Sequence, residues 1–197
     1  MNKSRLEAFS DGVFGFAITL LVLGVQVPTL RTINDTELRV ALLQALSQLV
    51  PYVTSFATIG IIWLNHHAMF QSVERVEHTT LTLNLLLLLV VTFIPYPTAV
   101  LSRYGALPSS AFLYGCTLTA LGIAYSLLWR HIARGGLSSV TSDTKQTRMR
   151  FRRNLAGSLT YPAAALIALR FPRVSIAIYF VVAIYYFIPS DRSAEPS

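Results

Sequence analysis

Apolar residues gather along the chain in long runs that are separated by short polar stretches. A run of about 20 apolar residues is long enough to cross the hydrocarbon core of a bilayer as a helix. Six such runs predict an all-α integral membrane protein with six membrane-spanning helices in one domain, residues 1–197. Their expected bounds are about 9–27, 40–63, 80–102, 109–130, 154–170 and 173–189.

Composition agrees with a lipid environment. Hydrophobic residues make up 53% of the 197 residues and charged residues only 13%, whereas about a quarter of a soluble domain is charged. The single cysteine, Cys116, excludes an intramolecular disulfide framework and a multi-cysteine metal site. The net charge of +7 belongs to a strongly apolar chain, so we expect lipid rather than nucleic acid as its partner.

The distribution of lysine and arginine predicts the orientation. With six spans, eleven of the sixteen basic residues fall on one side of the membrane. Loops rich in Lys and Arg stay in the cytoplasm, so both termini are expected there. The basic loop at 131–153 contributes most to this bias, and we interpret it as a topology determinant in contact with anionic lipid.

Polar residues within the spans cluster at two places. The first span begins with "RLEAFSDG", and the second ends with "IIWLNHHAMF". If the first span leaves the cytoplasm and the second returns, both clusters lie at the cytoplasmic end. The residues concerned are Arg5, Ser10, Asp11, Trp63, Asn65, His66, His67 and Phe70, with Thr19 deeper in the first span.

Ionisable groups within a membrane are costly and usually paired, so this cluster is a candidate site. One interpretation is structural: the groups bond one another and hold the first span against the second. A second is proton handling, because histidine titrates near neutrality. A third is a metal site with Glu74, Glu77 and His78 as further ligands, although adjacent helical histidines point about 100° apart. The structural interpretation is favoured.

The first span also carries an apolar stripe. Phe9, Val13, Phe16, Leu20 and Leu23 recur at spacings of four, three, four and three residues, which places them along one side of a helix. Such a stripe is typical of lipid contact or helix packing. Alternatively it lines a pore, since rings of apolar side chains can gate by dewetting. Small residues that would let other helices approach are Gly12, Gly15, Ala17 and Gly24.

Signatures of soluble enzymes are missing from the sequence, which has no Walker A motif, no GxSxG and no HExxH. Ser10 near His67 is the one candidate nucleophile–base pair, and a network or capping serine is commoner. We therefore expect no enzyme activity, no cofactor and no bound metal. A TVGYG-type potassium filter is missing as well.

The stretch "RLEAFSDGVFGFAITLLVL" together with "WLNHH" resembles the transmembrane protein 175 family, which comprises the lysosomal potassium channel and its prokaryotic relatives. The family signature is an arginine, three residues and then Phe-Ser-Asp, which is matched by Arg5, Phe9, Ser10 and Asp11. The match covers residues 5–23 and 63–70 by motif and the remainder by the six-span layout.

The resemblance implies a potassium channel without a re-entrant pore loop, located in a prokaryotic plasma (inner) membrane. It implies that single-repeat members form homotetramers in which the first helix lines a central pore. By position, Phe16, Leu20 and Leu23 would form the constriction, and Thr19 would help to orient it. Relatives usually carry Ile or Leu where this chain has Phe16.

These observations predict a potassium-selective, leak-type cation channel with a hydrophobic constriction on its first helix. The permeating ions would be K⁺ and, to a smaller extent, other monovalent cations or H⁺. The polar cluster, which includes Arg5, Ser10 and Asp11 of the first span, would brace the pore helix together with Phe9. The alternatives are a proton-conducting or proton-coupled transporter that uses Asp11, His66 and His67, and a membrane scaffold without transport.

Overall fold

The computed structural model describes residues 3–105, 107–135 and 159–187, and this part of the chain is helical, which confirms the predicted all-α fold. Residues 136–153 of the basic loop, 154–158 of the fifth predicted span and 188–189 of the sixth lie outside the described residues. The helices are α1 (Lys3–Leu20), η1 (Leu21–Gly24), α2 (Asp35–Gln71), α3 (His78–Phe93), α4 (Pro95–Tyr104), α5 (Pro108–Arg134), the helix Leu159–Ala168 and α7 (Pro172–Phe187).

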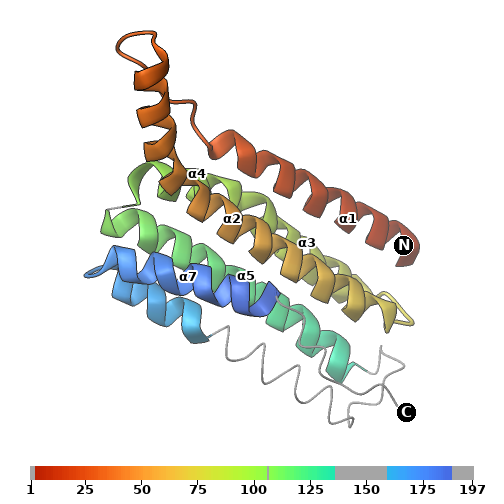
Figure 1. The fold of residues 1–197 in the computed structure, drawn as a ribbon. Coiled ribbons are helices and arrows are strands. Elements are labelled where there is room, and N and C mark those ends of the chain that lie inside the picture. Colours follow the sequence, from red (N-terminus) through yellow and green to blue (C-terminus); the bar gives the residue numbers. More distant parts are fainter. Residues whose placement is uncertain (1–2, 106, 136–158, 188–197) are drawn as a thin grey trace, which may run out of the picture.

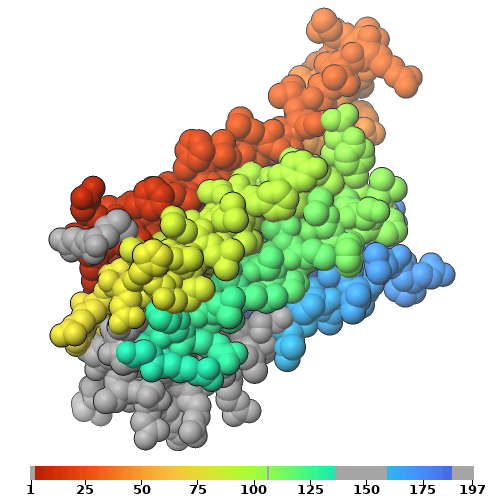
Figure 2. Space-filling model, turned by 180° about the vertical axis from the view of Figure 1, so that it is seen from behind, coloured from red at the N-terminus to blue at the C-terminus, as the bar shows by residue number. Residues whose placement is uncertain are grey.

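The helices lie side by side in one bundle (Figure 1). α1 is at one edge, where it contacts α2 and α3, while α7 is at the opposite edge against α2 and α5. The view from behind shows the same order, with α1 and α7 on opposite sides (Figure 2). One side of α1 therefore packs on the bundle, and the other side has no neighbouring helix among the described residues.

Four helical segments are long and apolar enough to cross a membrane: Lys3–Gly24, Asp35–Gln71, His78–Tyr104 and Pro108–Arg134. The helices Leu159–Ala168 and Pro172–Phe187 are apolar but shorter. At 1.5 Å per residue, the 16 residues of α7 extend about 24 Å, which is less than the roughly 30 Å of a hydrocarbon core. The described residues thus contain four segments of spanning length and, in addition, two shorter apolar helices.

The third spanning segment is bent at its prolines. A proline lacks an N–H group and its ring collides with the carbonyl four residues earlier, so it cannot continue an α-helix unchanged. α3 accordingly ends at Phe93, and α4 begins at Pro95, with Pro97 in its first turn. The Val91 carbonyl accepts a hydrogen bond from the Ile94 N–H instead (3.2 Å). The bend redirects the chain without interrupting the span.

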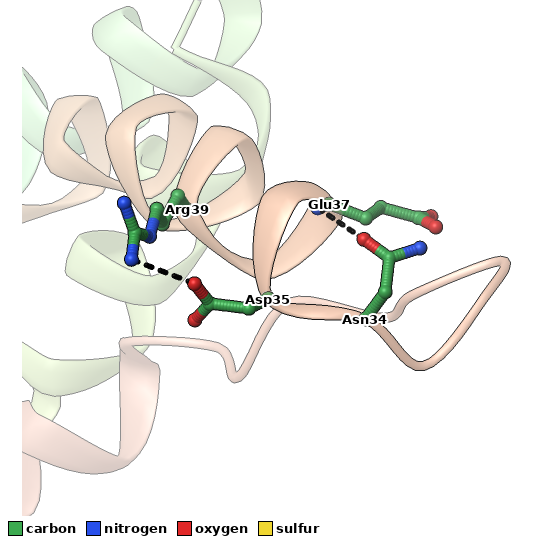
Figure 3. Close-up of polar contacts among 4 residues, drawn as sticks. All are labelled: Asn34, Asp35, Glu37 and Arg39. Carbon is green, nitrogen blue, oxygen red and sulfur yellow. Dashed lines mark hydrogen bonds and ion pairs between the residues drawn. The ribbon is translucent and has the colours of Figure 1, made fainter.

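α2 is longer than the apolar run 40–63 from which it was predicted. Its 37 residues extend about 55 Å, and its first turns project beyond the bundle (Figure 1). The start is capped: the Asn34 side chain accepts from the Glu37 N–H at 2.8 Å, which satisfies one of the free donors at a helix N-terminus. An exposed ion pair between Asp35 and Arg39 (2.7 Å) lies beside it (Figure 3).

A buried chain of hydroxyl groups ties α2, α4 and α5 together. Thr98 Oγ1 donates to the Ile94 carbonyl at 2.7 Å. Ser55 Oγ, 2.7 Å from Thr98 Oγ1, therefore donates to Thr98, and the Tyr114 hydroxyl, 2.8 Å away, donates to Ser55. Each of the three side chains is fully buried. Each of these three hydroxyl groups has a partner, as buried polar groups require.

The other half of the core depends on close helix packing. Gly115 of α5 faces α7 and the helix Leu159–Ala168, where a Cβ would collide with the Tyr179 hydroxyl and with Ala165. The Tyr179 hydroxyl can therefore donate to the Ala111 carbonyl (3.2 Å). Among the large side chains that are buried in the bundle are Leu6, Phe14, Phe70, Leu87, Tyr114, Leu118 and Tyr179.

Candidate functional site: the first helix and its polar network

α1 has two distinct faces. Phe14 and Ala17, together with Leu6 about two turns before Phe14, are buried against the bundle. On the opposite side Phe16 is 63% exposed, and Phe9 and Leu23 are likewise exposed. Val13 and Leu20, the remaining members of the predicted stripe, are half-buried at its border. In the single chain the stripe therefore lies on the free side of α1.

Open space surrounds Phe16. A Cβ added to Gly12 or to Gly15 would meet no atom within 4 Å, so neither glycine is needed for packing within the chain. Thr19 is exposed one turn further on, and its hydroxyl donates to the Phe16 carbonyl at 2.8 Å. This bond fixes the Thr19 side chain against the backbone of the helix. A neighbouring molecule, or a water-filled path, has room on this face.

The buried face of α1 is joined to two other helices by a hydrogen-bonded chain. Ser10 Oγ donates to the Leu6 carbonyl at 2.9 Å and accepts from Asn84 Nδ2 at 3.0 Å. Asn84 Oδ1 lies 2.7 Å from His66 Nε2, and since an amide oxygen can only accept, the imidazole donates. Ser10, His66 and Asn84 are all buried. The chain connects α1, α2 and α3 at one level of the bundle.

The imidazole of His66 is also held by aromatic neighbours. Its ring centroid lies 5.4 Å from that of Phe14 on α1 and 4.5 Å from that of Phe70 on α2. These separations are typical of favourable ring pairs. His66 is thus fixed at three points, by two rings and by Asn84, and has little freedom to move.

A second connection between α1 and α2 lies at the surface. Trp63 Nε1 donates to Asp11 Oδ1 at 2.8 Å. The indole stacks on the ring of His67, with centroids 6.1 Å apart, and His67 Nε2 lies 3.0 Å from Gln71 Nε2. Lys3 completes the connection by donating to the Gln71 carbonyl at 3.2 Å. Asp11 is therefore paired with tryptophan.

Two residues of the predicted cluster lie outside this network. Arg5 is exposed on the free side of α1 and makes no hydrogen bond or ion pair with any described residue. Asn65 is half-buried on the other side of α2, where its carbonyl accepts from the Tyr125 hydroxyl at 3.5 Å. The structure thus joins Ser10, Asp11, Trp63, His66 and His67 into the network and leaves Arg5 and Asn65 apart from it.

Asn84 is the functional residue that sequence reasoning missed. It is the only amide in the apolar run "LTLNLLLLLVV", and this isolation is a signal that could have found it. Metal ligation finds no support among the described residues, where no three His, Cys, Asp or Glu side chains come together. What the arrangement can do is hold α1 firmly by its buried face while its apolar face stays free.

Comparison with known proteins identifies the family. A family model described as the endosomal/lysosomal potassium channel TMEM175 matches residues 5–95. A potassium channel of Streptomyces collinus is 38% identical over 208 aligned residues, which cover the whole of both chains. The chain belongs to the TMEM175 family.

Its structure agrees with this assignment. The crystal structure of a homologue of the lysosomal potassium-selective channel TMEM175, from Chamaesiphon minutus, superimposes with a TM-score of 0.83 at 35% identity. The match covers 93% of this chain and 95% of the homologue. The human TMEM175, named as an endosomal/lysosomal proton channel, is 30% identical over 182 residues, which are 85% of this chain and 35% of the human protein.

Proposed function

We propose that the protein is a potassium-selective, leak-type cation channel whose pore is lined by α1. The observation that carries the proposal is the apolar face of α1: in a member of this channel family, Phe16 and Leu23 are exposed on the free edge of the bundle. Four copies arranged around an axis would bring four such faces together, and closed rotational symmetry is the usual arrangement of homo-oligomers. The protein acts as an ion channel rather than as an enzyme.

The constriction consists of Phe16, Leu20 and Leu23, and Thr19 orients it. An apolar ring excludes water when it is narrow, so it can gate without any charged group. The phenyl ring of Phe16 is larger than the aliphatic side chains that the family usually has at this position. The open space beside Gly12 and Gly15 gives that ring room to swing aside. Selectivity then depends on how much of its hydration shell the ion must lose at these rings.

The polar network braces this helix. Ser10 and Asp11 tie α1 to Asn84 of α3 and to Trp63 of α2, and the ring of His66 packs against Phe14. Arg5 and Phe9 are exposed on the free side of α1, so a neighbouring subunit can reach them. In this proposal Arg5 pairs across the subunit interface, where an unpaired charge would be costly.

The protein is placed in a prokaryotic plasma (inner) membrane, with both termini in the cytoplasm. The bias of eleven basic residues against five supports this orientation. The polar network then lies at the cytoplasmic end of the pore. The partners are other copies of the chain, membrane lipid and monovalent cations, and conduction requires no cofactor.

A second candidate function is proton conduction. It is favoured by the name of the human relative and by the exposed positions of Asp11 and His67, two groups that can exchange protons with water. His66 is less suited to the task, because it is buried and donates to Asn84.

One flux assay separates these functions. The purified protein is reconstituted in liposomes, and flux is recorded under a potassium gradient, with sodium replacing potassium, and with and without a protonophore. A potassium channel gives a flux that does not saturate, needs no pH gradient and falls when sodium is the only cation. Flux that requires a pH gradient would support the proton alternative. The absence of any flux would contradict both transport functions and favour a membrane scaffold.

A further inference from the structure

A small cavity lies on the side of α2 that faces away from α1. Its volume is about 70 Å³, whereas a single buried water needs roughly 10–15 Å³. Four helices meet around it: α2, α5, α7 and the helix Leu159–Ala168. The cavity is separate from the polar network that holds α1, because neither Asp11 nor His66 lines it. Asn65, which lies outside that network, does line it.

The lining combines apolar walls with several hydrogen-bonding groups. Ile61 and Leu121 are among the apolar residues, while Tyr161 of the helix Leu159–Ala168 and Tyr186 of α7 bring hydroxyl groups. Ser126 of α5 brings a third hydroxyl. None of the described lining residues is charged. A guest that matches such a lining has an uncharged hydrogen-bonding head and an apolar body.

Asn65 brings a side-chain amide to the cavity. Its side-chain amide is half-buried at the cavity, and within the described parts of the chain it forms no hydrogen bond. An amide in an apolar surrounding is more stable with a hydrogen-bond partner than without one. A ligand that can both accept and donate a hydrogen bond, such as an alcohol, would satisfy the amide.

We propose that this cavity binds the hydroxyl head of an uncharged aliphatic amphiphile, with Asn65 as the principal hydrogen-bonding residue. The volume is enough for the head and the first carbons but not for a whole lipid. Free medium-chain alcohols and the glycerol head of a neutral lipid share this chemistry. The apolar remainder lies against Ile61 and Leu121 or in the surrounding bilayer.

The site is placed to regulate the pore, an extension that rests on the proposed channel function. α2 lies between α1 and α7 (Figure 1). Asn65 is one residue from His66 and two from Trp63, which hold α1. A guest that shifts or rotates α2 at Asn65 therefore shifts both connections to α1. Binding at the cavity alters potassium flux without entering the pore.

Photolabelling of the full-length protein in liposomes tests the site. The probe is octanol that carries a diazirine, and the labelled residues are mapped by mass spectrometry. Label is expected on cavity-lining residues of α2 and α5, such as Ile61 and Leu121, and is expected to fall at least fivefold in Asn65→Leu. Ile123→Ala, at an exposed position on α5 outside the cavity lining, is the matched control and should label like the unmodified protein.

A second variant, Gly122→Leu, fills the cavity with a side chain and should also lose label. It tests the site independently in case Asn65→Leu does not fold. Competition with unlabelled octanol and with dioleoylglycerol distinguishes a free alcohol from a neutral lipid, because only the preferred source displaces the probe at low concentration. Labelling that is spread over the lipid-facing surface and is equal in all variants would overturn the site, since the cavity would then hold water alone.

Flux separates the site from its regulatory role. Octanol should change potassium flux at least threefold in the unmodified protein and should have no effect in Asn65→Leu. Localised labelling without a change in flux would overturn regulation and leave binding supported. If no preparation conducts potassium, the proposed channel function fails, while the labelling result still decides whether the site exists.

Discussion

Asn84 allows a quantitative test of how α1 is held in the bundle. Its side chain is fully buried and bonds Ser10 on α1 and His66 on α2 at the same time. Asn84→Leu keeps the branched shape and the number of side-chain heavy atoms but removes both bonds. Ser10 retains its bond to the Leu6 carbonyl, so the main loss is the partner of the buried His66 Nε2–H.

The size of the effect follows from that unpaired group. Leaving one buried donor unsatisfied costs about 1–3 kcal/mol, whereas interhelical hydrogen bonds within membranes are worth about 0.6 kcal/mol on average and about 1.7 at most. Asn84→Leu should therefore lower the free energy of unfolding by about 1–2 kcal/mol. Removing the imidazole as well, in Asn84→Leu with His66→Phe, keeps an aromatic ring beside Phe14 and Phe70 and should cost little more, because replacing both partners leaves no polar group unpaired.

The assay is unfolding by sodium dodecyl sulfate in dodecylmaltoside micelles, followed by tryptophan fluorescence. Thr92→Val is the matched control on α3: its exposed hydroxyl bonds only the Leu89 carbonyl of its own helix, so it should cost less than about 0.5 kcal/mol. If Asn84→Leu were no more destabilised than Thr92→Val, or if the double variant showed additive losses, the buried network would not be what holds α1.

Three further changes test the packing and the pore face. Ser55→Ala leaves the buried Tyr114 hydroxyl without its acceptor and should lower the unfolding free energy by about 1–2 kcal/mol in the same assay; no change would show that Tyr114 finds another partner. Gly115→Ala should cost about 1–3 kcal/mol through overpacking against α7, and a neutral result would mean that these helices separate easily. A Cβ at Gly12 would meet no atom within 4 Å, so in Gly12→Leu stability should stay within about 0.5 kcal/mol while potassium flux falls, and unchanged flux would place this face outside the pore.

The sequence predicted the positions of the helices better than it predicted their lengths. The apolar runs located α1, α2 and α5, because hydrophobic length is what a bilayer selects. α2 nevertheless continues past residue 63 to Gln71, since helix formation does not require apolar residues once neighbouring helices pack against it. Its start at Asp35 depends on the Asn34 cap, a local hydrogen bond that a hydropathy pattern does not record.

The candidate site was predicted in part for similar reasons. The meeting of Asp11 with the end of α2 followed from the alternating direction of the spans. The partner of Asp11 did not, because Trp63 and His67 lie one turn apart on the same side of a helix and sequence alone cannot choose between them. Asn65 lies next to His66, yet a step of about 100° per residue turns it to a different side of α2, towards Tyr125.

The most direct test of the central claim is the permeability ratio of Phe16→Ala, measured as the reversal potential between potassium and sodium across a reconstituted bilayer. Phe93→Ala, which truncates an exposed phenylalanine on α3, is the control. If the Phe16 rings form the constriction, their removal widens it, and sodium permeation should rise relative to potassium in Phe16→Ala alone. An unchanged reversal potential in Phe16→Ala, or an equal shift in both variants, would contradict a pore lined by α1 with Phe16 at its narrowest part.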